Sequence, residues 1–261
     1  MNNKCKRQPP GGLCSERGAV RKRDGASVSV PIRIAPSLIC ADLCNLEQSI
    51  RSLEKLGVDY LHVDLIDAHF SPSMPLGLET VRQLRNKTAL PFDVHLMVED
   101  NEFFIREMAK IGVQQLCFHC ESAFHVDRTL SLIQENGISA GIALMPATPF
   151  SVLEYCLERI SFVLLMLINP GFADRKEEKQ VPYAERRVAD CRRFLNDRGL
   201  DIPIEIDGRV SFESIPRLVA AGADILVTGS SSLFHKGGTL SENFGKTKKA
   251  ISIGWEKRKV L

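Results

Sequence analysis

The sequence contains no run of about 18 uncharged apolar residues, which excludes a membrane-spanning helix. It also has no apolar segment near its start of the kind that forms a secretory signal. We therefore expect a cytoplasmic protein whose eight cysteines stay reduced, since a chain of 261 residues can bury a core without disulfides. Cys117 and Cys120 form a Cys-x-x-Cys pair, but no second pair follows at zinc-finger spacing, so we interpret them as a core thiol and a strand-end thiol.

Net charge is also small, at +2, but it is unevenly distributed. The first 30 residues carry seven Lys/Arg against two acidic residues, or +5, which leaves −3 for the remainder. A slightly acidic body argues against a nucleic-acid-binding surface. Residues 1–30 lack hydrophobic periodicity, and we predict a disordered extension before one catalytic domain at 31–261. A transit peptide, a basic arm that binds polyanions and an upstream extension of the reading frame are the alternatives for residues 1–30.

From Pro31 onward, short apolar runs alternate with stretches of helical apolar spacing. One helical stripe contains Leu46, Ile50, Leu53 and Leu56, and glycine follows several such stripes, as at helix ends. Eight strand–helix repeats predict a (β/α)8 barrel, or TIM barrel, and a doubly wound open sheet is the competing architecture. The predicted strands are Ile32–Leu38, Tyr60–Leu65, Phe92–Met97, Gln115–His119, Ser139–Leu144, Phe162–Ile168, Ile202–Asp207 and Ile225–Thr228.

Four residues with metal-binding side chains stand on three of these strands. His62 and Asp64 are two apart, so they share a strand face, while His95 and Asp207 stand on two further strands. In a barrel, chemistry is placed at the carboxyl ends of the strands. Two imidazoles and two carboxylates suit a divalent metal such as Zn, Fe(II), Mn or Co. The alternative is that each polar group only satisfies a neighbour inside the barrel.

At these residues the sequence resembles the ribulose-phosphate 3-epimerase family, over about 32–234. The resemblance rests on IAPSLICADL (Ile34–Leu43), LHVDLIDAHF (Leu61–Phe70), FDVHLMV (Phe92–Val98), MPATP (Met145–Pro149), NPGF (Asn169–Phe172), IEIDG (Ile204–Gly208) and VTGSSSLF (Val227–Phe234). It implies a TIM barrel, a homo-oligomer and one divalent metal between His62, Asp64, His95 and Asp207. It further implies Asp64 and Asp207 as the acid/base pair, Ser37 as a substrate contact, and Met97 and Met166 above the metal. Simple core filling is an equally compatible interpretation of the two methionines.

The implied chemistry also follows from the residue types. Inverting C3 of a ketose requires removal of a hydrogen next to the C2 carbonyl and return of one to the opposite face. Two carboxylates facing each other across the sugar can carry these protons, and a divalent metal can stabilise the enediolate between the two steps. We therefore expect an epimerase acting on a pentulose or hexulose phosphate, such as ribulose 5-phosphate, xylulose 5-phosphate or allulose 6-phosphate.

The chain departs from the family at the expected phosphate site. The family usually has NPGFGGQ and DGG, where this chain has NPGFADR (Asn169–Arg175) and Asp207-Gly208-Arg209. Either arginines replace backbone donors, or the substrate's far end differs, or both arginines point to solvent. Ile66, Ala68 and Ser73 also replace the family's usual residues around strand 2. The predicted substrate contacts are Ser37, His95, Met97, Met166, Gly171, Arg175, Gly208, Arg209, Gly229 and Ser230.

Two other functions remain as alternatives. A phosphosugar decarboxylase or aldolase could use the same barrel, but such relatives rely on lysine-rich sites and no lysine stands at a predicted strand end. A non-catalytic paralogue could bind a phosphosugar, with residues 1–30 as a polyanion-binding tail. The intact ligand quartet favours the enzyme. We expect a small-molecule ketose phosphate as its partner, and neither nucleic acid nor membrane.

Overall fold

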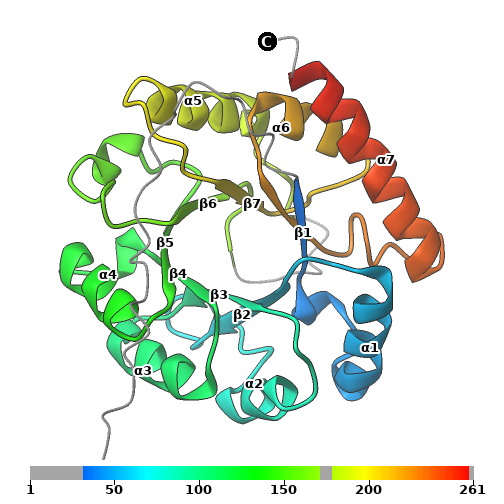
Figure 1. Cartoon of the computed structure of the whole chain (residues 1–261), viewed down its shortest axis with the longest axis horizontal. Coiled ribbons are helices and arrows are strands. Elements are labelled where there is room, and N and C mark those ends of the chain that lie inside the picture. The colour runs from blue at the N-terminus through cyan, green and yellow to red at the C-terminus, as the bar shows by residue number, and fades with distance from the viewer. Residues whose placement is uncertain (1–31, 171–177, 259–261) are drawn as a thin grey trace, which may run out of the picture.

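Eight parallel strands stand in a ring at the centre of the molecule, with helices around the outside (Figure 1). The computed structural model describes residues 32–170 and 178–258. The predicted extension at 1–30, together with Gly171 and Arg175, lies outside the described residues. The strands are β1 (Arg33–Pro36), β2 (Leu61–Ile66), β3 (Phe92–Met97), β4 (Gln115–His119), β5 (Ser139–Leu144), β6 (Phe162–Met166), β7 (Ile204–Asp207) and β8 (Ile225–Thr228).

The strand order confirms the barrel over the open sheet. Strands pair in the order β1-β8-β7-β6-β5-β4-β3-β2, so β2 to β8 lie side by side in sequence order and β1 pairs with β8. A bridge between Ser37 and His62 joins the carboxyl end of β1 to β2. The amides of Asp59 and Tyr60 also donate to the carbonyl of Ile34, at 3.1 and 3.4 Å. These contacts bring the first and last strands of the sheet together and complete the ring.

Helices follow the strands and cover their outer faces. The α-helices are α1 (Leu46–Leu56), α2 (Leu78–Arg85), α3 (Asn101–Ile111), α4 (Val126–Glu135), α5 (Ala184–Asn196), α6 (Ile215–Ala221) and α7 (Leu240–Arg258), and the 3-10 helices are η1 (Leu38–Cys40), η2 (Leu43–Asn45), η3 (Cys120–Ser122) and η4 (Phe150–Leu153). Helices α1 and α3 end at Gly57 and Gly112, whose φ angles of 73° and 84° are in the left-handed region that glycine adopts without strain.

One predicted repeat differs from the others, because the described segment between β5 and β6 contains no α-helix. Pro146 and Pro149 begin this segment, and proline removes the backbone donors that a helix needs. The segment instead forms η4 and a series of turns. Leu153, Cys156, Leu157 and Ile160 are nevertheless buried, so it covers the barrel as an α-helix would.

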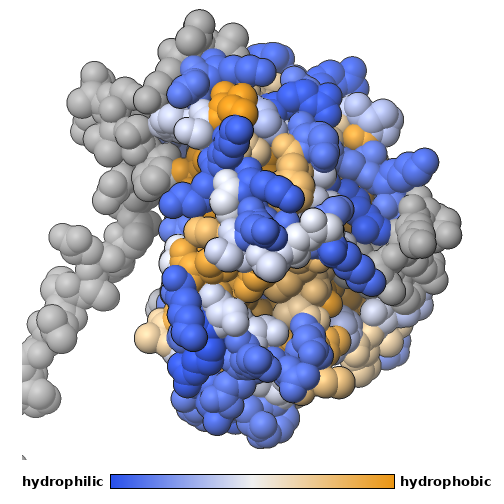
Figure 2. Space-filling view, turned by 90° about the vertical axis from the view of Figure 1, so that its right-hand side faces the viewer, coloured by the Kyte–Doolittle hydropathy of each residue, from blue (hydrophilic) through white to orange (hydrophobic). Residues whose placement is uncertain are grey.

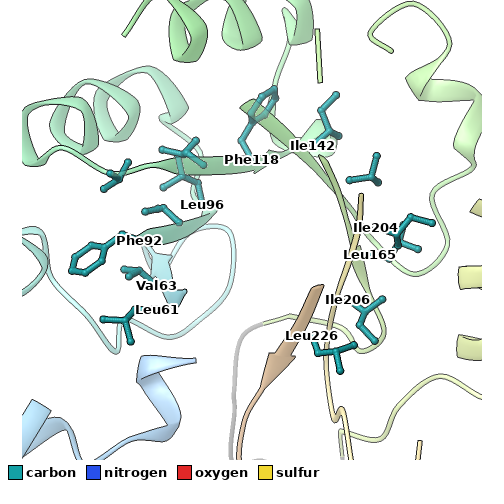
Figure 3. Close-up of a cluster of buried hydrophobic side chains, with 14 of the residues drawn as sticks. Leu61, Val63, Phe92, Leu96, Phe118, Ile142, Leu165, Ile204, Ile206 and Leu226 are labelled. Atoms are coloured by element: carbon teal, nitrogen blue, oxygen red, sulfur yellow. The ribbon is translucent and has the colours of Figure 1, made fainter. Parts of the chain in front are cut away.

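Alternation along the strands sorts the side chains into two environments. Residues facing outward, among them Leu61, Val63, Phe92, Leu96 and Ile142, form the main hydrophobic core beneath the helices (Figure 3). Inside the barrel, Cys117, Ala143, Phe162, Leu164, Met166 and Ile168 form a second apolar cluster. A Cβ atom at Gly141 would lie 2.4 Å from Phe162 Cζ, so only glycine leaves room for that ring. Polar side chains occupy the rest of the interior and form the candidate site.

The surface is consistent with the absence of a membrane-spanning run in the sequence. Figure 2 shows a face on which hydrophilic side chains predominate around smaller apolar areas. Within 32–170 and 178–258, no helix combines the length and the apolar character needed to cross a bilayer.

Candidate metal and substrate site

The inner faces of β2 and β3 carry two pairs of polar residues that lie directly opposite one another. His62 on β2 is in register with Asp93 on β3, and Asp64 is in register with His95. Because side chains two apart share a face, each strand contributes an imidazole and a carboxylate to the interior. Asp207, the last residue of β7, completes the predicted quartet from across the barrel.

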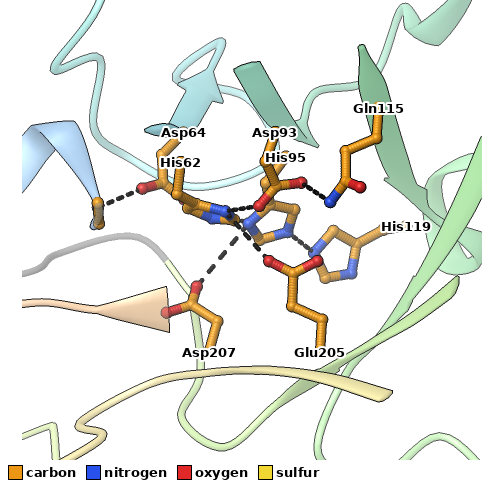
Figure 4. A network of polar contacts seen from close by, with 9 residues as sticks. His62, Asp64, Asp93, His95, Gln115, His119, Glu205 and Asp207 are labelled. Carbon is orange, nitrogen blue, oxygen red and sulfur yellow. Dashed lines mark hydrogen bonds and ion pairs between the residues drawn. The ribbon is translucent and has the colours of Figure 1, made fainter. Parts of the chain in front are cut away.

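The structure brings the four predicted metal-ligating residues together (Figure 4). Asp64 Oδ1 lies 3.2 Å from both His62 Nε2 and His95 Nδ1, and Asp207 Oδ2 lies 3.8 Å from His95 Nδ1. One ligand atom from each of the four residues lies within 4.8 Å of all the others. This cluster can hold one metal ion.

The hydrogen bonds of His62 fit a metal ligand. Its Nδ1 lies 2.6 Å from Asp93 Oδ2, and Gln115 Nε2 donates to the other Asp93 oxygen at 2.8 Å. The proton of neutral His62 is therefore on Nδ1, which leaves a lone pair on Nε2. That buried Nε2 atom has no hydrogen-bond partner, although it faces the Asp64 carboxylate. Two acceptors this close need a shared proton or cation, and a carboxylate behind the imidazole is the usual arrangement at metal sites.

The pKa values of the buried groups also indicate that this site favours a positive charge. Burial alone would lower the pKa of His62, but the charges of Asp64 and Asp93 raise it well above its ordinary value. Glu205 on β7 lies 3.4 Å from His62 Nδ1, and burial together with the Asp93 charge raises the pKa of Glu205 well above its ordinary value. Three carboxyl groups thus surround His62 in the barrel interior.

The two expected acid/base carboxyl groups have different environments. Asp64 is buried, which opposes ionisation, yet the charge and hydrogen bond of His62 and the hydrogen bond of His95 hold its pKa far below the ordinary value. For Asp207, burial and the neighbouring Asp64 charge outweigh the His62 charge and the hydrogen bond from the Gly208 amide, and raise its pKa to about 7. Without a metal, Asp64 therefore ionises more readily than Asp207.

A cavity opens above the quartet at the carboxyl ends of the strands. Ser37 lines it and donates to Asp64 Oδ2 at 2.7 Å. His95 is fully buried beneath the cavity and is not one of its lining residues. The other predicted substrate contacts that the structure describes, together with both carboxylates, line this one cavity: Asp64, Met97, Met166, Asp207, Gly208, Arg209, Gly229 and Ser230.

Arg209 occupies a constrained position at one side of this cavity. Its φ of 51° is in the left-handed region, where the family usually has glycine. The side chain is half-buried, and Nε donates to the carbonyl of Glu178 at 2.9 Å. The interpretation that Arg209 points freely into solvent is therefore wrong.

Sequence reasoning missed the residues that support the quartet. Asp93 and Glu205 stand two residues before His95 and Asp207, so the period of two that located the ligands also indicates them. His119, at the end of β4, is fully buried, and its Nε2 lies 2.9 Å from His95 Nε2. Cys40, which was not predicted, also lines the cavity, and burial raises the pKa of its thiol to about 11.

Fold and site together define a (β/α)8-barrel enzyme with a two-histidine, two-carboxylate centre. Comparison with known proteins identifies the family. Residues 33–234 match the model of the Ribulose-phosphate 3 epimerase family. The chain is 39% identical over 201 residues to ribulose-phosphate 3-epimerase from Bacillus subtilis (strain 168), covering 77% of this chain and 91% of the relative. It is 38% identical over 199 residues to the Escherichia coli (strain K12) protein of that name, covering 76% and 87%.

Solved structures support the fold alone. A mutant tryptophan synthase alpha-subunit from Pyrococcus furiosus superposes with a TM-score of 0.58 at 15% identity, covering 84% of this chain and 98% of that one. Phosphoribosylanthranilate isomerase from Thermotoga maritima gives a TM-score of 0.53 at 16% identity, covering 85% and 98%. The chain belongs to the ribulose-phosphate 3-epimerase family and is an isomerase of the epimerase class.

Proposed function

We propose that this enzyme inverts C3 of a ketose phosphate with a divalent metal bound by His62, Asp64, His95 and Asp207. The observation that carries the proposal is that Asp64 and Asp207 reach the same cavity from different sides of the barrel, on β2 and β7. A substrate between them presents its two faces to two carboxyl groups. The names of the relatives give ribulose phosphate as their substrate. Ribulose 5-phosphate is our pentulose candidate, and allulose 6-phosphate is the hexulose candidate.

In the proposed reaction, one carboxylate removes the C3 proton and the other carboxyl group returns a proton to the opposite face. When bound, a divalent cation supplies positive charge that stabilises the enediolate. Ser37 holds the Asp64 carboxylate through its hydroxyl donor and orients it toward the cavity. Met97 and Met166 line the cavity beside the carboxylates, where apolar side chains exclude water from the reacting atoms.

The far end of the substrate lies, in this proposal, against the ends of β7 and β8. Gly208, Gly229 and Ser230 line the cavity there, and small residues allow a phosphate to approach backbone amides. Arg209 adds a guanidinium at the same side of the cavity and is the residue we assign to the terminal phosphate. The cytoplasmic location and the homo-oligomer remain predictions.

The test is exchange of the C3 hydrogen with deuterated solvent, followed by NMR, on metal-free enzyme and on enzyme reloaded with Fe(II) or Zn(II). Ribulose 5-phosphate and allulose 6-phosphate are supplied separately. Metal-dependent exchange and epimerisation with one sugar would support the proposal and establish the chain length. Tight metal binding without exchange of either sugar would contradict it and favour a non-catalytic paralogue.

Two variants test the assignment of the carboxylates. Asp64→Asn and Asp207→Asn each remove one proton carrier, so epimerisation should fall by about 10²–10⁴-fold. Bound metal is measured in the same samples, because both residues are also proposed ligands. Asp190→Asn on the outer surface of α5 is the matched control and should retain full activity. Full activity in either cavity variant would rule out a two-carboxylate mechanism.

A further inference from the structure

A hydrogen-bonded chain leads from His95 outward through the end of β4. His95 Nε2 lies 2.9 Å from His119 Nε2, and His119 Nδ1 lies 3.3 Å from Glu121 Oε2 (Figure 4 shows the two rings). Both imidazoles are fully buried. Of these three residues only His95 belongs to the ligand quartet, and neither His119 nor Glu121 lines the cavity.

The atoms in contact determine where the protons are. His95 faces the quartet with Nδ1, so this nitrogen must keep a lone pair if it is to bind a metal. The proton of His95 is then on Nε2 and is donated to His119 Nε2. His119 in turn carries its proton on Nδ1 and donates it to Glu121. Each bond in the chain has one donor and one acceptor only in this arrangement.

Glu121 itself can only accept, because other donors surround it. Its Oε1 accepts from the Met145 amide at 2.9 Å and from the Thr148 hydroxyl. Arg187 on α5 fixes this segment by donating to the carbonyls of Met145 and Thr148, at 2.7 and 2.9 Å. The donors to Glu121 outside the barrel therefore determine which nitrogen carries the proton on His119 and, through it, on His95.

We propose that His119 and Glu121 are positioning residues that fix the tautomer and ring orientation of His95 and thereby raise the affinity of the quartet for its metal. The inference rests on the metal centre of the proposed function and assigns two further residues to it. His62 has a direct carboxylate partner in Asp93, whereas His95 reaches its carboxylate through a second imidazole. Removing such a partner typically costs 10–100-fold in metal affinity.

The experiment measures Zn(II) affinity by competition with a chelator on the full-length protein. His119→Phe keeps the ring volume but removes the acceptor, and should bind Zn(II) 10–100-fold more weakly. His119→Gln supplies one acceptor and one donor and should restore binding to within about threefold of wild type. A role in packing alone predicts the reverse order, because the apolar ring suits a buried site better than an amide does. The unfolding temperature of each metal-free variant shows whether it folds.

Glu121→Gln gives a second test with almost no change of shape. The Gln amide oxygen must face Met145 and Thr148, which turns the amide NH₂ toward His119 Nδ1. His119 would then be protonated at Nε2 and His95 at Nδ1, the atom needed for the metal. We expect about tenfold weaker Zn(II) binding and ¹⁵N NMR signals of the exchanged tautomers in the metal-free protein. Glu154→Gln, which removes a surface ion pair with Arg198, is the matched control.

The outcomes separate this inference from the function on which it depends. If the wild type binds Zn(II) and His119→Phe binds it equally tightly, the positioning role is overturned and the metal centre remains. The same conclusion follows if His119→Gln binds Zn(II) as weakly as His119→Phe does. Absence of Zn(II) binding by the wild type would overturn the metal centre and the positioning role with it. An unchanged tautomer in Glu121→Gln would refute the proposed direction of the hydrogen bonds.

Discussion

Ala68 has a backbone conformation that alanine rarely adopts, and this gives a prediction opposite to the usual effect of glycine. Its φ is 65°, in the left-handed region, and the residue is exposed. The side chain of Asp67 maintains the turn by accepting from the amides of His69 and Phe70, both at 2.9 Å, and from the amide of Glu99 at 2.7 Å. These bonds link the turn after β2 to the end of β3, so relaxation of Ala68 alone would break several of them.

The magnitude follows from two opposing effects in Ala68→Gly. A left-handed conformation costs a non-glycine residue about 1–2 kcal/mol, and glycine removes that cost. Glycine also gains about 0.5–1 kcal/mol of conformational freedom in the unfolded chain, which opposes folding. The net effect is stabilisation by about 0.5–1 kcal/mol, or a rise of about 1–4 °C in the unfolding temperature for a domain of this size. No packing is lost, because the Ala68 methyl group is exposed.

Thermal unfolding followed by circular dichroism measures the effect. The matched control is Ala189→Gly within α5, where helix propensity predicts destabilisation by about 1 kcal/mol and a fall of about 2–4 °C. The two substitutions are chemically identical and differ in backbone conformation, so their effects should have opposite signs. Equal destabilisation by both would refute the left-handed assignment at Ala68.

Three further predictions concern the site. Ser37→Ala removes the buried hydroxyl that donates to Asp64. Loss of a hydrogen bond to a charged group costs about 1.5–3 kcal/mol, so kcat/KM should fall about 10–150-fold. A change below threefold in steady-state assays would contradict this prediction. Asp93→Asn removes the charge behind His62, and Zn(II) affinity measured by chelator competition should fall about 10–100-fold; unchanged affinity would show that the carboxylate does not support the ligand. Burial opposes ionisation of Glu121, but hydrogen bonds from His119, Thr148 and the Met145 amide lower its pKa to about 2, from an ordinary value of 4.5. Because the pKa of Glu121 is lower in the folded than in the unfolded protein, its ionised form stabilises the fold above pH 4.5, and this stabilisation is lost as the pH falls toward 2. The free energy of unfolding measured in urea should therefore fall less across that pH range in Glu121→Gln than in the wild type.

Much of this fold could be predicted from the sequence because parallel strands buried on both faces give short apolar runs that are easily located. The predicted and observed bounds agree at Phe92–Met97, Gln115–His119, Ser139–Leu144 and Ile225–Thr228. The run at Phe162–Ile168 is longer than β6, which ends at Met166, although Leu167 and Ile168 remain buried. Residues that follow the last hydrogen-bonded pair of a strand can still be buried and apolar, so hydrophobicity alone does not locate the end of a strand.

The candidate site was only partly accessible to the same reasoning, because spacing identifies a shared face but not a tertiary neighbour. His119 ends β4, and nothing in its local sequence shows that the turn after β2 covers it. In the structure the Phe70 ring lies against His119, with ring centroids 4.7 Å apart. That contact encloses the imidazole beside His95, and it joins residues 49 positions apart in the sequence. The position of the Arg209 side chain likewise depends on Glu178, from the segment after β6.

The polar interior of the barrel has two layers that depend on each other. Toward the carboxyl ends of the strands, Asp64, His95 and Asp207 face the cavity or lie directly beneath it; one step deeper, Asp93, Gln115 and Glu205 are fully or almost fully buried. Buried polar groups destabilise a fold unless each one is paired. The deeper layer pairs His62 through Asp93, and His119 pairs His95 from the side, so neither imidazole is left with an uncommitted proton. Transfer of the four ligands alone to another barrel should therefore give a weaker site, since the residues that determine which nitrogen is free would be missing.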